Sequence, residues 1–224
     1  MKNSKGLSWI CIGLLLIAAA LSIIGYNIWE DKNAEASVKD VMRQMETVVH
    51  PKAIDSSEQP AVTETTVEMP IYPETAEIPD YILNPNMDMP TVVLDGYEYL
   101  GIVKIPDANI ELPVIAAWNY PALKRAPCRF SGSVYTDDMI IAGHNYSAHF
   151  KQLNTLKGGE EVLFTDIDGN IFSYTVSYAE IVNGTDAEGM TAGEWDMTLF
   201  TCSTDGKCRV VVRCEREDTV NTKR

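Results

Sequence analysis

The sequence predicts a mainly β domain behind an N-terminal transmembrane helix, and three observations carry this prediction. Residues 7–28 form a run of 22 residues without a charged side chain. Prolines recur among Thr, Glu and Asp between residues 51 and 90. From about residue 95, short apolar runs alternate with turn residues, giving about eight strands in about 130 residues, which is typical of a closed or nearly closed β-barrel or of a β-sandwich.

The first apolar run predicts a membrane anchor. As a helix it is about 33 Å long, enough to cross a hydrocarbon core of about 30 Å. Lys2 and Lys5 precede it, so the positive-inside rule places the N-terminus in the cytoplasm and the rest of the chain outside. A cleaved signal peptide is the alternative, since small residues stand at Ala18–Ala20, but the apolar run continues to Ile28. We therefore expect an uncleaved, single-pass protein of the cell membrane.

The segment that follows the anchor is acidic. Residues 30–90 contain 13 acidic and four basic side chains, and the whole chain has a formal charge of −14. Proline-rich chain with like charges extends rather than collapses, which predicts a stalk. The absence of a basic cluster argues against nucleic acid and against an anionic lipid surface as partners.

Two parts of the predicted stalk have a pattern of their own. Ile78–Leu83 could dock on the domain as a lid. A short amphipathic helix leaving the membrane is predicted by apolar residues near helical spacing at Val38, Val41, Met42, Met45, Val48 and Val49.

These observations divide the chain into five parts. The expected boundaries are a cytoplasmic stub at 1–6, the anchor at 7–29, the stalk at 30–94, a folded domain at 95–217 and a tail at 218–224.

Alternating apolar patterns predict the strands of the folded domain. A hairpin is predicted at Asp168-Gly169. We expect strands over Tyr97–Ile105, Ile110–Ala117, Met139–Ala142, Glu161–Asp166, Asn170–Ile181, the run ending at Cys202 and the run from Arg209. Helical turns are expected over Asn119–Ala126 and over Ser147–Leu156, the latter with Phe150, Leu153 and Leu156 on one face.

A cysteine near the carboxyl end is the strongest candidate for chemistry. Cys202 closes an apolar run, a turn pair Asp205-Gly206 follows, and Arg209 opens the next run. Two neighbouring strands would bring the thiol and the guanidinium face to face. A positive neighbour favours the thiolate, which is the nucleophilic form. The plainer interpretation is a small buried cysteine, which is the common use of a free thiol.

The other cysteines do not predict a structural disulfide. Cys11 lies in the membrane run. Cys208 and Cys214 are six residues apart on one strand, about 20 Å, against a Cα limit of about 7 Å. A bridge from Cys202 to Cys208 across the loop is geometrically possible and would silence the thiol, so we regard it as an oxidation hazard.

A catalytic cysteine needs a partner that exchanges protons near neutral pH, which is the property of histidine. The chain has three histidines. His50 lies in the predicted stalk, and His149 begins a predicted helix, where a solvated or capping role is expected. His144 follows the apolar strand MIIAG where the chain leaves the sheet, a place where sites concentrate. We favour His144.

Three arginines compete for the place beside the thiol. Arg209 and Arg213 are four residues apart and face the same side of a strand, whereas Arg216 faces the other. Arg213 is about 13 Å further from the loop that borders Cys202. We therefore choose Arg209, and expect Arg213 and Arg216 to be solvated cations on the strand surface.

Other kinds of site are not predicted. No acidic pair has a metal-ligand spacing, Asp166–Gly169 is explained by turn chemistry, and no glycine-rich phosphate loop is present. We expect neither a metal nor a cofactor.

The motifs together resemble a known family. TLFTC with Arg209 behind it, and IAGHN at residues 141–145, resemble the signature of the sortases, membrane-anchored cysteine transpeptidases of Gram-positive bacteria. The likeness continues through YLGIVKIPDANIELPV and HFKQLNTLKGGEEVLFTDIDGNIFSYTV and covers nearly all of residues 95–216. It implies the eight-stranded sortase β-barrel, with Cys202 as nucleophile, His144 as catalytic histidine and Arg209 as catalytic arginine.

The resemblance also implies a reaction. A sortase cleaves an LPxTG-like sorting signal through a thioacyl-enzyme and transfers the surface protein to an amine of a cell wall precursor or to a pilin lysine. Thr201 would contribute a hydrogen bond in the oxyanion site. Met190 and Trp195, in or beside the loop Asn183–Glu194, are candidates for apolar contacts with the peptide. The text CRVVVRCER looks most like the pilin-polymerising type, and the subclass stays open.

Two other classes of function remain. An L,D-type peptidoglycan transpeptidase is also β-rich with His and Cys, but its pattern has Gly directly before the cysteine, where this chain has Thr201. A non-enzymatic anchored surface module needs no reactive thiol.

Overall fold

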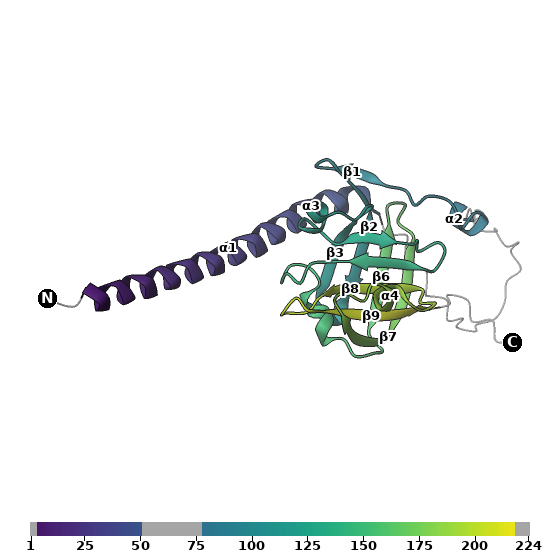
Figure 1. The fold of residues 1–224 in the computed structure, drawn as a ribbon. Coiled ribbons are helices and arrows are strands. Elements are labelled where there is room, and N and C mark those ends of the chain that lie inside the picture. The colour runs from purple at the N-terminus through teal and green to yellow at the C-terminus, as the bar shows by residue number, and fades with distance from the viewer. Residues whose placement is uncertain (1–3, 51–77, 218–224) are drawn as a thin grey trace, which may run out of the picture.

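The computed structural model describes residues 4–50 and 78–217. A long N-terminal helix leads to a β-barrel that lies against the second half of the helix (Figure 1). The helices are α1 (Ser4–Val48), α2 (Asp80–Leu83), α3 (Tyr120–Leu123) and α4 (Ala187–Thr191), and 3-10 turns are η1 (Pro106–Ala108) and η2 (Lys151–Thr155). The strands are β1 (Val92–Leu94), β2 (Tyr97–Ile105), β3 (Ile110–Ile115), β4 (Cys128–Ser131), β5 (Met139–Ala142), β6 (Glu161–Asp166), β7 (Ile171–Asn183), β8 (Met197–Cys202) and β9 (Cys208–Arg216).

Eight of the nine strands close into a barrel, which confirms the expected fold. The strand order is β2-β3-β4-β5-β8-β9-β7-β6, and β6 pairs with β2 to complete the ring. The pairs β3–β4 and β5–β8 are parallel, and the other neighbours are antiparallel. β1 is added beside the first residues of β2, outside the ring.

A glycine allows the barrel to close. Gly101 on β2 has φ of 157° and pairs with Asp166 on β6. A Cβ at this position would lie 2.1 Å from the carbonyl oxygen of Thr165. Only glycine therefore permits the two strands to approach this closely.

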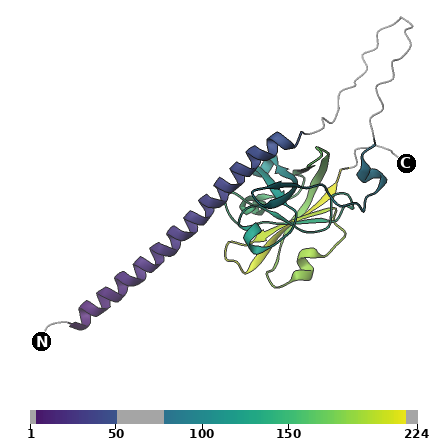
Figure 2. The ribbon, with the colours of Figure 1, turned by 90° about the horizontal axis from the view of Figure 1, so that it is seen from above.

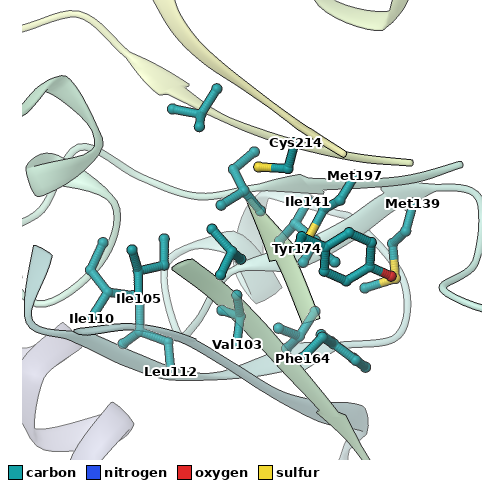
Figure 3. Packing of buried hydrophobic residues seen from close by; sticks show 14 of the residues in the cluster. Val103, Ile105, Ile110, Leu112, Met139, Ile141, Phe164, Tyr174, Met197 and Cys214 are labelled. Atoms are coloured by element: carbon teal, nitrogen blue, oxygen red, sulfur yellow. The ribbon is translucent and has the colours of Figure 1, made fainter. Parts of the chain in front are cut away.

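The barrel interior is filled by apolar side chains that alternate along the strands (Figure 3). Members of this core that Figure 3 labels include Val103, Leu112, Ile141, Phe164, Tyr174, Met197 and Cys214. The predicted apolar face of the segment 147–156 also joins it, because Phe150, Leu153 and Leu156 are buried. The core thus holds the strand ends that carry the site in fixed register.

The second half of α1 buries an apolar stripe on the barrel. Val41, Met45 and Val49 pack against a cluster that includes Tyr99, Ile115, Leu123 and Cys128 on the outer wall of the barrel. Of the predicted stripe, Val48 alone is 40% exposed. The predicted amphipathic helix is confirmed, and it continues the anchor without a break to Val48.

The first half of α1 exposes its apolar side chains. Trp9, Leu15, Ile23 and other large apolar residues up to Trp29 are more than half exposed. Within the described residues, α1 is the one helix that is long and apolar enough to cross a membrane. Such exposure is what a bilayer would cover.

The segment that was expected as a stalk is described in part. Residues 51–77 lie outside the described residues. Behind them, Tyr81 of α2 stacks on Tyr135 at 4.8 Å and lies 5.2 Å from Phe172. Arg216, at the end of β9, also lies over Phe172.

The position of α2 bears on its possible role as a lid. Arg216 is seven residues along β9 from Arg209, or about 23 Å. α2 therefore docks at the end of the barrel opposite Cys202 and does not cover it.

Two strands, β1 and β4, were not predicted from the sequence. β1 has three residues, and β4 has the sequence CRFS, so neither contains an apolar run or an alternation long enough to be recognised. Their existence depends on partners already in place, β2 for β1 and β5 for β4.

We predict that Met45→Ala destabilises the full chain by about 2–5 kcal/mol, because it empties a fully buried site between α1 and the barrel. Val48→Ala on the exposed side of the same helix is the matched control, with a cost below about 0.5 kcal/mol. Urea unfolding of the barrel in detergent micelles, followed by near-UV circular dichroism, measures both. Equal costs would mean that α1 does not support the barrel.

Candidate active site

The register of three neighbouring strands brings the predicted site residues to one end of the barrel. β5 and β8 run parallel, with Ala142 opposite Phe200. His144 and Cys202 each follow two residues later, and the Gly143 N–H donates to the Phe200 carbonyl at 3.0 Å. On the other side of β8, Cys202 is paired directly with Arg209 of β9. Adjacent strands are about 4.8 Å apart, so Cys202 lies beside Arg209, and His144 follows the strand on the other side of β8.

Cys202 and Arg209 face the same side of the sheet because they form a cross-strand pair. Both side chains are half-buried. One guanidinium nitrogen of Arg209 donates to the carbonyls of Gly206 at 3.3 Å and Cys208 at 2.9 Å. The arginine side chain is thereby held against the β8–β9 loop.

The same register separates the two cysteines of the loop. Cys208 precedes Arg209 on β9, so its side chain points to the face opposite Cys202. All five cysteines are free. A Cys202–Cys208 bridge would require the strand pairing to break.

Two further thiols are inert. Burial raises the pKa of Cys128 and of Cys214 to about 12. Their thiolate fraction near neutral pH is negligible, so they are structural residues of the two apolar clusters.

His144 is half-buried where the chain leaves β5. A Cβ on the preceding Gly143 would lie 2.5 Å from the Phe150 ring, so glycine is required there. The imidazole stacks on Tyr146, with ring centroids 4.6 Å apart. Among the described residues, its Nε2 has no hydrogen-bond partner. Burial lowers the pKa of His144, and the Glu30 carboxylate partly opposes this shift.

His149 differs from the expectation of a solvated or capping residue. It is 1% exposed and lies before η2 rather than within a helix. Burial lowers its pKa to about 4, so the ring is neutral near neutral pH. His149 is therefore enclosed, whereas His144 is half-buried where the chain leaves β5.

Arg213 was expected to be solvated, and this expectation is wrong. The side chain is 2% exposed and pairs with Glu180 at 3.0 Å. It also donates to the carbonyls of Gly189 and Met190. Arg213 thus anchors α4 and the loop around it over the sheet.

Arg216 was also expected to be solvated and is instead half-buried. It pairs with Asp137 at 2.5 Å and donates to the Val134 carbonyl at 3.1 Å. Neither arginine competes with Arg209 for the thiol. Loops pack over both arginines, and the strand pattern alone could not predict those contacts.

Thr201 lies next to Cys202 but on the other face of β8. It is 2% exposed, and its Oγ1 has no hydrogen-bond partner among the described residues. Strand alternation directs this side chain into the barrel, whereas Phe200 and Cys202 face outward.

A hollow lies on the outer face of β5 and β8, on the side to which Cys202 points. Ile140, Thr198, Thr191 and Trp195 are among the residues that line it. Trp195 is packed edge-on against Tyr178 at 5.3 Å. Of the two apolar candidates, Trp195 therefore lines the hollow, while the backbone of Met190 binds Arg213.

An exposed row of aromatic rings was missed by sequence reasoning. Phe200, two residues before Cys202, contacts Phe130 at 5.5 Å, and Phe130 contacts Trp118 at 5.9 Å. Tyr120 continues the row at 5.2 Å and is 70% exposed. The rings come from three separate segments, so no local pattern joins them.

Comparison with known proteins identifies the family. The model of the sortase domain family matches residues 103–217, just over half of the chain. No curated protein matches the chain.

Similar solved structures include three sortases. Sortase C of Streptococcus pneumoniae has 22% identity and a TM-score of 0.47, with 53% of this chain and 68% of that chain covered. The sortase D5 transpeptidase of Clostridium perfringens has 20% identity and a TM-score of 0.48, covering 56% and 82%. Sortase A of Listeria monocytogenes has 22% identity and a TM-score of 0.48, covering 54% and 88%.

The family match spans β5, β8 and β9, the three strands whose register brings His144, Cys202 and Arg209 together. On this match, the chain belongs to the sortase family.

Proposed function

We propose that this sortase cleaves an LPxTG-like sorting signal with Cys202 as nucleophile and transfers the product to an amine. The observation that carries the proposal is the register of β5, β8 and β9, which sets His144, Cys202 and Arg209 side by side. The amine belongs to a cell wall precursor or to a pilin lysine.

In the first half-reaction, the Cys202 thiolate attacks the carbonyl carbon of the threonine in the signal. Arg209, paired across the strand, stabilises the negative charge that develops on the carbonyl oxygen. The C–N bond to glycine then breaks, and the His144 imidazolium donates its proton to the leaving amine. A thioester and neutral imidazole remain.

In the second half-reaction, the incoming amine attacks the thioester carbon. Neutral His144 accepts a proton from the amine, and Cys202 leaves as thiolate. The new amide bond replaces the thioester, and both side chains return to their initial charge. The hollow beside β8, with Trp195 on its wall, is our candidate for the peptide groove.

We propose that the first half of α1 anchors the enzyme in the cell membrane with the N-terminus in the cytoplasm. The exposed apolar side chains of α1 and the two lysines before them support this orientation. The proposed division remains a cytoplasmic stub at 1–6, anchor at 7–29, extracytoplasmic acidic, proline-rich stalk at 30–94, catalytic domain at 95–217 and tail at 218–224.

Cys202→Ala in the full chain, assayed in detergent micelles with a fluorogenic LPxTG-type peptide and a primary amine, is expected to abolish turnover. Cys208→Ala is the matched control, since its thiol faces the other side of the sheet, and it should keep most of the activity. No turnover of any sorting peptide by the unmodified chain would refute the proposed function. Peptidoglycan cross-linking in its place would favour the L,D-type reaction.

Substitutions of Arg209 and Arg213 should affect the kinetics in different ways. Arg209→Ala is expected to lower kcat by about 10²–10³-fold, because it removes a donor to the oxyanion. Arg213→Lys keeps the charge beside Glu180 but loses donors to the α4 carbonyls, so it should raise KM more than it lowers kcat. Steady-state kinetics on both variants separate the two roles. A kcat loss confined to Arg213→Lys would assign the oxyanion role to Arg213 in place of Arg209.

Thr201 is proposed to donate a hydrogen bond in the oxyanion site. Its hydroxyl is unpaired among the described residues but lies on the barrel side of β8, opposite Cys202, so the contact requires the hydroxyl to turn toward the Cys202 face during the reaction. Thr201→Val should then lower kcat about tenfold or more, while Thr201→Ser retains it. Full activity of Thr201→Val would assign the residue to packing alone.

A further inference from the structure

The loop that carries His144 is bonded to the helix that carries the anchor. Asp31 of α1 accepts a hydrogen bond from the Ser147 backbone N–H at 2.8 Å, and its second oxygen accepts from the Ser147 hydroxyl. Glu30 accepts from the Tyr146 hydroxyl at 3.4 Å and pairs with Lys124 at 2.5 Å. Two consecutive acids therefore bind two consecutive residues of the loop.

Tyr146 links this contact to the imidazole. Its ring stacks on His144 at 4.6 Å, with 23° between the planes, and also lies 5.4 Å from His149. Within the described part of the chain, the side-chain hydrogen bonds that leave residues 145–148 reach only Glu30 and Asp31. The ring that fixes the orientation of His144 is thus itself held by α1.

The contact lies directly beyond the proposed membrane span. A hollow at this point is lined by Asn27 and Ile28 of α1 together with Asn145, Tyr146 and Lys151. The β8–β9 turn also points to the side where α1 begins, while β9 ends on the far side, in both views (Figures 1 and 2). The catalytic end of the barrel therefore faces the anchor.

We propose that Glu30 and Asp31 are positioning residues for His144, so that the anchor helix is a working part of the active site. The inference rests on the proposed role of His144 in acyl transfer. Neither acid touches the reacting atoms. They act by holding Tyr146 and Ser147, and a general acid must lie within hydrogen-bond reach of the leaving amine to work.

The charges around His144 provide a second readout. Glu30 of α1 and Lys124 after α3 lie near the imidazole, and Tyr146 and His149 share its loop. Glu30 raises the pKa of His144, whereas burial and Lys124 lower it. Removal of the Glu30 charge should therefore lower the pKa of His144, so less imidazolium is present at a given pH.

The test compares Glu30→Gln and Asp31→Ala with Glu35→Gln in the full chain in detergent micelles. Glu35 is on the same helix, but its ion pair is the exposed one with Lys39, so it is a matched control. We expect kcat to fall about tenfold in the first two variants, with KM nearly unchanged. Glu30→Gln keeps an acceptor for Tyr146 but removes the charge that favours the imidazolium of His144, whereas Asp31→Ala removes both acceptors for Ser147. Asp31→Asn, which keeps an acceptor for the Ser147 N–H, should restore most of the rate.

The pKa of His144, followed through its ring proton resonances, should fall in Glu30→Gln and stay unchanged in Glu35→Gln. The chain has three histidines, so the resonances can be assigned by substitution. A kcat in Glu30→Gln and Asp31→Ala equal to that of the control would overturn the inference while leaving the proposed function intact. If Glu30→Gln lowers the pKa of His144 but the unmodified chain turns over no sorting peptide, the proposed function is overturned and the link between α1 and His144 stands.

Discussion

The placement of β8 between a parallel neighbour and an antiparallel neighbour is the constraint on which the site depends. The register of β5 against β8 places His144 at the same end of the barrel as Cys202, and the register of β9 places Arg209 opposite Cys202. A slip of one residue in β8 would turn Cys202 into the barrel and bring Thr201 to the surface. The apolar core residues of β8, Met197 and Leu199, oppose that slip because it would expose them.

Defined side-chain contacts hold α4 and α1 on the outer wall of the barrel. α4 and its loop are tied to the sheet by Arg213, whose guanidinium has a carboxylate and two carbonyls as partners. On another part of the wall, α1 covers the cluster around Tyr99 and Cys128. Between these elements, a hollow lies on the outer face of β5 and β8, beside Ile140 and Thr198.

Local patterns were sufficient for much of the fold. β2 has the bounds that alternation predicted, β5 has those of its apolar run, and the Asp168-Gly169 turn joins β6 to β7 as expected. The membrane-exit helix was predicted from its apolar spacing, although Val48 faces outward. Of the site, the order of the motifs and the strand register agree in bringing Cys202, His144 and Arg209 to one end.

Long-range contacts account for what local patterns could not predict. Arg213 is buried because Glu180, 33 residues away, and the carbonyls of α4 surround it. The link from Glu30 to Tyr146 spans 116 residues. His149 was expected to be solvated or to cap a helix because it begins a predicted helix, yet the fold encloses it. A residue's neighbours in sequence do not reveal such partners.

The unbroken course of α1 has a consequence for substrate choice. From Glu30 to Val48 the helix rises about 27 Å, and the barrel packs along this length rather than hanging from a flexible tether. With the first half of α1 anchored in the membrane as proposed, the enzyme would rotate and diffuse in the membrane plane, and the continuous helix would hold its thiol at one distance from the bilayer. The number of residues between the scissile bond and the substrate's own membrane segment would then decide whether the bond reaches Cys202.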